Sequence, residues 1–199
     1  MRLAAILAML LLCTSCDRPA IEPGQSLVGA KELPPAKALS HETIEINRAS
    51  RSSTSGRLTY ELRPDDSLIV TLASQDWKTP IGHEIFQLQP EIAEQARRAL
   101  WRVRPEELKG VEWINPPPDC PPPPTDTHPE IAVAFIAEGP KPGVADDRVG
   151  IFDLPYKSIC DTRQSNEARA LIQGVLRSFP ASKVATEFEQ RRDIILVPS

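Results

Sequence analysis

The sequence has few aromatic residues, few glycines and no excess of positive charge. Phe, Trp and Tyr make up 5% of the 199 residues, which argues against a stacking platform for bases or sugars. Asp and Glu number 27 against 23 Lys and Arg, and a chain with a net charge of −4 is poorly suited to general nucleic-acid binding. The 41% of hydrophobic residues excludes wholesale disorder, whereas the 21 prolines must lie in linkers and loops.

No apolar run is long enough to cross a bilayer. The longest run extends from Leu3 to Cys13 and follows Arg2. Its eleven residues (3 to 13 inclusive) fall short of the roughly 20 that a membrane-spanning helix needs. A positive charge, a short apolar segment and then small residues are typical of a secretory signal peptide.

This segment ends with Cys13-Thr14-Ser15-Cys16, and here the chain resembles the bacterial lipoproteins. Their signal peptides end in a lipobox, in which an aliphatic residue and two small residues precede a Cys. The resemblance implies cleavage before Cys16, attachment of fatty acyl chains such as palmitate to Cys16, and a mature protein anchored on the membrane by lipid. The sequence departs from the lipobox at Cys13, where Leu or Val is usual. An ordinary cleaved signal peptide, with Cys16 as a plain thiol, is the alternative.

The chain divides into three parts on this interpretation. Residues 1–15 are the expected signal peptide, residues 16–40 are the lipidated N-terminus and a flexible Pro-rich tether, and residues 41–199 form a single extracytoplasmic domain. In lipoproteins of some enteric bacteria, Asp after the lipidated Cys retains the protein at the inner membrane. Asp17 therefore favours the inner membrane, with the domain facing the periplasm or the cell exterior.

Alternating apolar residues predict strands in the first half of the domain. Residues 58–62 and 68–72 alternate on either side of Pro64-Asp65-Asp66, which predicts a β-hairpin. Residues 43–47 are expected to add a strand before it. Further strands are expected at residues 131–137 and 150–154.

Helical spacing of apolar residues predicts helices at residues 90–103 and 168–179, and a further amphipathic segment at 184–188. The predicted fold is therefore α+β, with a mostly antiparallel sheet packed by two or three amphipathic helices. Glu94 and Arg98 are spaced for a helical ion pair. Glutamates are interspersed among the arginines on or near this helix, which favours a solvated helix face over a basic patch that meets anionic lipid headgroups or a cell-wall polymer. These arginines are Arg97, Arg98, Arg102 and Arg104.

Two cysteines remain once Cys13 is removed with the signal peptide and Cys16 is assigned to the lipid. In an oxidising compartment Cys120 and Cys160 are expected to form a disulfide, and no Cys-x-x-Cys spacing indicates a redox role. Cys120 lies within the proline-rich run of residues 116–124. That run favours a stiff surface loop, and a docking strip for an aromatic-lined groove is the alternative.

The motifs of common enzymes and metal sites are not found. His41, His83 and His128 lack the spacing of a zinc-binding helix, and there is no Gly-x-Ser-x-Gly motif or phosphate-binding Gly loop. A metal cluster of Asp119, Cys120, Asp126 and His128 is disfavoured because Cys120 is expected to be oxidised.

The sequence therefore assigns no catalytic, cofactor-binding or metal-binding residues. It predicts a membrane-anchored lipoprotein whose non-catalytic domain binds or scaffolds a partner, for which an envelope protein is the expected class. A cell-envelope hydrolase with dispersed catalytic residues, and a small inhibitor or immunity-type lipoprotein, remain the alternatives. Neither the identity of the partner nor the oligomeric state follows from the sequence.

Overall fold

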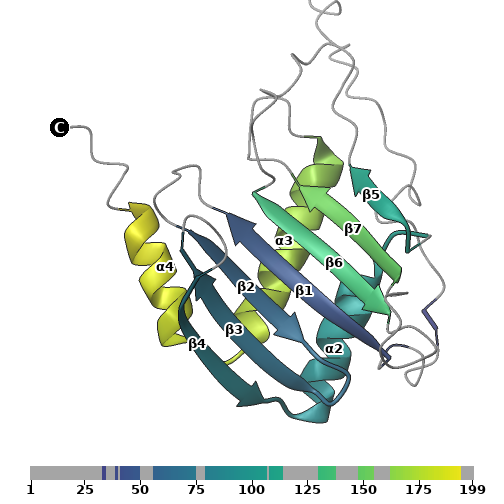
Figure 1. Cartoon of the computed structure of the whole chain (residues 1–199). Helices are drawn as coiled ribbons and strands as arrows, with labels where there is room; N and C mark the ends of the chain where they lie inside the picture. The colour runs from purple at the N-terminus through teal and green to yellow at the C-terminus, as the bar shows by residue number, and fades with distance from the viewer. Residues whose placement is uncertain are drawn as a thin grey trace, which may run out of the picture.

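A computed structural model of the chain describes residues 33–34, 39, 41–49, 56–74, 79–106, 108–113, 130–137, 148–154 and 162–193. Within these ranges, seven strands form a single sheet in the order β4-β3-β2-β1-β6-β7-β5 (Figure 1). The strands are β1 (Glu42–Ala49), β2 (Arg57–Leu62), β3 (Ser67–Ala73), β4 (Pro80–Gln87), β5 (Gly110–Trp113), β6 (Ile131–Ala137) and β7 (Arg148–Leu154). The helices are α2 (Pro90–Trp101), α3 (Arg163–Ser178) and α4 (Lys183–Asp193).

The expectation of an α+β fold with a mostly antiparallel sheet is confirmed. Every neighbouring pair of strands is antiparallel except β5 and β7, which pair in parallel. β1 is central, because it pairs with β2 on one side and with β6 on the other. The predicted strands correspond to β1, β2, β3, β6 and β7, whereas β4 and β5 were not predicted.

The turn between β2 and β3 forms as its residue types predict. The Arg63 N–H donates to the Ser67 carbonyl at 2.9 Å, and the Asp66 N–H donates to the Arg63 carbonyl at 3.0 Å. Asp66 has a φ of 63°, a left-handed conformation that Asp tolerates better than most residues. The Asp65 carboxylate accepts from the Ser67 N–H at 3.0 Å. The hairpin is therefore closed by local hydrogen bonds as well as by its two strands.

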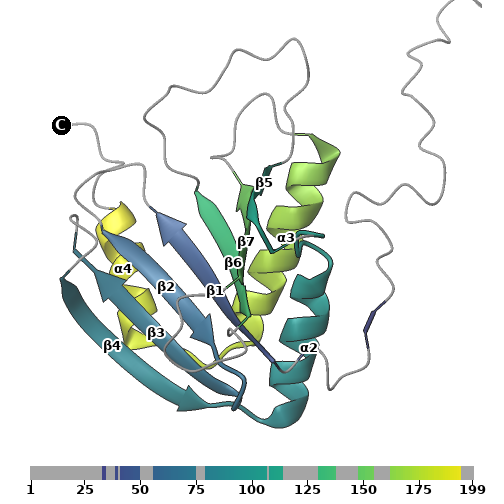
Figure 2. The same ribbon diagram turned by 45° about the vertical axis from the view of Figure 1, so that its right-hand side comes forward.

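All three described helices lie on the same face of the sheet (Figure 2). α4 contacts β2, β3 and β4, while α3 contacts β7 and packs against α2. Alternate residues of the strands point toward these helices and are almost fully buried, which accounts for the period-two pattern of the sequence. The most deeply buried of these strand residues are Ile46, Leu58, Leu62, Leu68, Val70, Leu72, Val133, Phe135 and Leu154.

Side-chain caps determine where two of the helices begin. The Thr162 hydroxyl accepts from the Ser165 N–H at 3.0 Å, and the Thr162 N–H donates to the Ser165 hydroxyl at 2.8 Å. This reciprocal cap starts α3 earlier than the predicted range of 168–179, because the apolar stripe shows only the buried part of the helix. At the start of α4, the Ser182 hydroxyl accepts from the Ala185 N–H at 3.1 Å.

The prediction of a solvated arginine face on the first helix is wrong for Arg97. Arg98 pairs with Glu94 at 2.7 Å, as the spacing predicts. Arg97, in contrast, is 2% exposed, and its guanidinium donates to the backbone carbonyls of Glu42 and Arg63. The turn that contains Asp66 lies over this position and supplies the Asp66 carboxylate as an acceptor for Arg97. A helical wheel of the helix alone would instead predict that Arg97 faces water.

Candidate binding surface

One face of the sheet carries no helix in the part of the chain that the structure describes, and we call it the helix-free face. It consists of the strand residues that alternate with the buried ones. Strand register places these side chains in rows that cross the sheet. Its members include Glu45, Asn47, Thr59, Glu61, Ile69, Thr71, His83, Ile85, Ala132, Ala134, Ile151 and Asp153.

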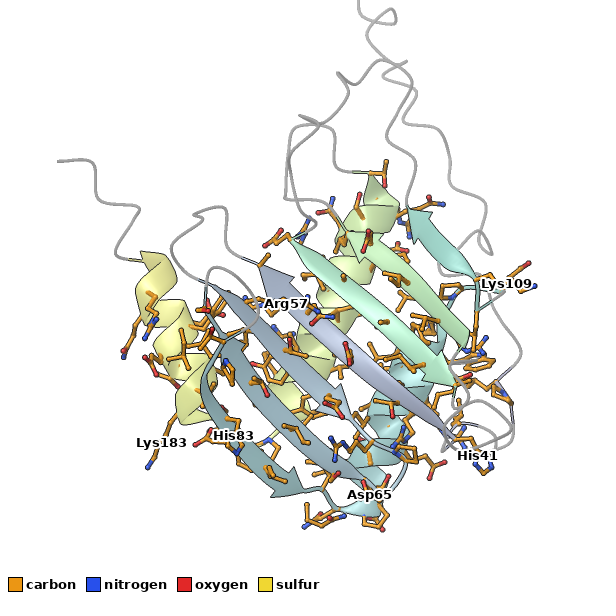
Figure 3. The ribbon with its side chains drawn as sticks, viewed as in Figure 1. His41, Arg57, Asp65, His83, Lys109 and Lys183 are labelled. Atoms are coloured by element: carbon orange, nitrogen blue, oxygen red, sulfur yellow. The ribbon has the colours of Figure 1, made fainter. Side chains whose placement is uncertain are left out.

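A polar network lies on the helix-free face near the end of β1 and the start of β2. The Asn47 side-chain oxygen accepts from Arg57 Nε and from the Thr59 hydroxyl, both at 2.8 Å. Asn47 is only 9% exposed, so these two bonds satisfy an acceptor that would otherwise be costly to bury. The network links β1 to β2 and holds Arg57 in place at one end of its strand (Figure 3).

Exposed apolar side chains gather on β4, at one edge of the same face. Ile81 is 43% exposed and Ile85 is 64% exposed. Ile85 lies opposite Ile69 of β3, so the apolar surface extends from the edge strand to its neighbour. Large exposed apolar residues that are grouped in this way are more typical of an interaction surface than single ones.

Asp153 lies on the helix-free face toward the other edge of the sheet. Its Oδ1 atom is buried and has no hydrogen-bond partner in the structure. Burial raises the pKa of the Asp153 carboxyl above its ordinary value, because it disfavours the charged form. Its register neighbours are Ala132 on β6 and Trp113 on β5, which supply no second titratable group for acid–base chemistry.

A hollow of about 350 Å³ opens between the end of α3, the start of α4 and Tyr60 of β2. Burial raises the pKa of the Tyr60 hydroxyl, and the neighbouring Arg48 guanidinium opposes this effect. Arg48 also pairs with Glu189 and lies 5.6 Å from the centre of the Phe188 ring.

Two other hydroxyls around this hollow take part in internal contacts. The Ser182 hydroxyl donates to the Glu84 carboxylate at 2.6 Å, and the Thr186 hydroxyl donates to the Ser182 carbonyl at 2.9 Å. These contacts join α4 to the sheet and cap its first turn. Ser182 and Thr186 thus serve the packing of α4, and the helix-free face is the stronger candidate for recognition.

The described residues contain no group of three or more His, Cys, Asp or Glu that could hold a metal ion. Figure 3 shows His41 and His83 well apart on the sheet, so they do not share a site. Cys16, Cys120, Cys160 and His128 lie outside the described residues, as does the proline-rich run at 116–124. No described helix has the length and apolar character needed to cross a membrane.

Sequence reasoning missed the apolar edge because it missed β4 altogether. Within β4 only Ile81, Ile85 and Phe86 are strongly apolar, and Gly82 and Glu84 occupy the positions that face the helices. The sequence signal for this strand was limited to the pair Ile81 and Ile85, which lie four residues apart after Pro80. The chain matches no family model, no curated protein and no solved structure, so the surface must be interpreted from its own chemistry.

Proposed function

We propose that this protein is a lipid-anchored lipoprotein of the bacterial envelope whose domain binds or scaffolds an envelope protein without catalysing a reaction. The observation that carries the anchoring is the N-terminal sequence, in which a charged and apolar segment leads to Cys16. Two or more acyl chains on one residue give stable membrane attachment, whereas one chain gives marginal attachment.

The binding role is supported by the asymmetry of the sheet. One face is buried under three helices, while the helix-free face combines the apolar pair Ile69 and Ile85 with the ordered Asn47 network. Such a mixture of apolar area and fixed polar groups suits recognition of a protein surface. We also propose that the helices pack by amphipathic faces, which the burial of Ala93, Leu100 and Ile172 supports.

Metabolic labelling tests the anchor. Cells that express the native chain, Cys16→Ser or Cys13→Ser are grown with a clickable palmitate analogue, and the purified protein is assayed for label. We expect label on the native chain and on Cys13→Ser, and none on Cys16→Ser. Label that survives in Cys16→Ser, or a native chain without label, would refute the anchoring.

Site-specific photo-crosslinking tests the binding surface separately. A crosslinking amino acid replaces Glu61 on the helix-free face or, as a matched control, Gln173 on the exposed side of α3. We expect a discrete envelope-protein adduct from position 61 and none from position 173. Identical patterns from the two positions would contradict the use of the helix-free face.

A further inference from the structure

Among the described strands β4 is the outermost at one end of the sheet, and one hydrogen bond shows which of its backbone groups face outward (Figures 1 and 2). The Leu88 N–H donates to the Asp66 carbonyl at 3.1 Å. In the register of β3 and β4, the backbone groups of residue 88 therefore point toward β3. Because bonded and outward residues alternate in an antiparallel pair, the backbone groups of His83, Ile85 and Gln87 point away from the sheet.

The protection that edge strands usually carry is missing from this part of β4. Residues 82 to 87 contain no Lys or Arg. Their single acid, Glu84, faces the helices, where its carboxylate accepts from the Ser182 hydroxyl at 2.6 Å and from the Val184 N–H at 3.5 Å. Pro80 and an irregularity opposite Leu72 and Ala73 blunt only the beginning of the strand. The regular part therefore presents an edge without basic side chains, with Ile85 exposed on the helix-free face, and this edge can accept another strand.

We propose that β4 pairs with β4 of a second copy of this chain, antiparallel, about a two-fold axis at Ile85. In this register His83 lies opposite the partner's Gln87, and Glu84 lies opposite the partner's Phe86. The three outward residues of each copy exchange about six backbone hydrogen bonds. The two sheets become continuous, and Ile69 and Ile85 of both copies form one apolar strip across the junction.

The charges and the regularity of β4 disfavour the two neighbouring registers on its N-terminal side. An axis at Glu84 would place two carboxylates directly opposite each other, which is destabilising. An axis at His83 would bring the irregular beginning of the strand into the pairing. At Ile85 the strand meets its own copy with no like charges opposed and isoleucine against isoleucine, so this register is self-complementary, as a two-fold interface requires. The inference does not depend on the lipid anchor or on the envelope partner.

The proposal is tested by sedimentation equilibrium of the full-length protein in density-matched detergent. The native chain is expected to dimerise, and Ile85→Lys, which places two ammonium groups at the axis, is expected to weaken the dimer by more than about tenfold. Ala170→Lys, on the exposed side of α3, is the matched control and should dimerise as the native chain does. A native chain that stays monomeric, or an unchanged dimer in Ile85→Lys, would overturn the proposal.

Mild oxidation of cysteine variants tests the register and does not depend on how the lysine variant folds. Ile85→Cys is expected to form a disulfide between two copies, since its two sulfur atoms would lie at the axis within bonding distance. Gln87→Cys, which would face the partner's His83, should form none. Mass spectrometry of the linked peptides distinguishes these bonds from any made by the native cysteines. Equal crosslinking of both variants, or crosslinking of Gln87→Cys alone, would overturn the register.

Discussion

Replacement of Arg97 by Met should destabilise the fold through two backbone carbonyls that only a long cationic side chain can reach. Arg97 Nη1 donates to the Glu42 carbonyl at 3.0 Å, and Nη2 donates to the carbonyl of Arg63. The pairing of β1 with β2 ends at Ile44 and Leu62, and continuing its register by two residues would place Pro64, which has no N–H to donate, opposite Glu42. Arg97 therefore supplies the hydrogen bond that the ladder lacks at this point.

The magnitude of this effect follows from the burial of the group. Hydrogen bonds to a charged group contribute about 1.5–3 kcal/mol each, and a buried acceptor that loses its partner costs about 1–3 kcal/mol. Two facts reduce the net effect: Arg97 Nε has no hydrogen-bond partner in the structure, and the Arg63 carbonyl also accepts from Asp66. Met recovers part of the apolar packing, so we expect Arg97→Met to lower the free energy of unfolding by about 2–3 kcal/mol.

Urea unfolding followed by circular dichroism measures this loss. Arg98→Met is the matched control, because it removes the neighbouring arginine of the same helix, whose partner Glu94 is exposed. An exposed helical ion pair contributes about 0.3–0.5 kcal/mol, so the control should lie close to the native protein. Equal losses in the two variants would refute the assignment of Arg97 to a buried bonding role.

Two further variants test other features of the fold. Burial raises the pKa of Asp153, so the folded state binds its proton more tightly than the unfolded state and stability falls as pH rises between the unfolded and folded pKa values. Asp153→Asn should therefore raise the melting temperature at neutral pH and lose this advantage below the unfolded pKa; an advantage that is constant with pH would contradict this reasoning. Thr162→Ala should lower the free energy of unfolding by about 1 kcal/mol, because it removes the α3 cap; thermal denaturation measures this loss. Thr71→Ala, which makes the same replacement in strand β3 and removes no helix cap, is the control.

The sequence predicted the strands and helices whose buried residues recur with a regular period. It did not predict the features that depend on which strands lie side by side. The β2–β3 hairpin was predictable because Leu58, Leu62 and Leu68 alternate on either side of a turn whose residue types close it locally. The position of β1 between β2 and β6 was not predictable, since periodicity shows which face of a strand is buried but not which strand lies beside it. The role of Arg97 depends on the same information, because its acceptors lie 55 and 34 residues away.

The sequence did not predict β4, the proposed interaction edge, because its apolar and polar residues do not follow the pattern of the other strands. In most strands of this sheet the apolar residues face the helices and the polar residues face away. β4 partly reverses this pattern, since Ile85 faces away while Glu84, beside Phe86, faces the helices and bonds to Ser182. A strand that turns its acid toward the helices and exposes an isoleucine gives a weak prediction as a core strand of a monomer. The same reversal is expected where a partner strand brings a second apolar side chain beside the first, as the β4–β4 pairing does with the two copies of Ile85, because each then removes water from part of the other.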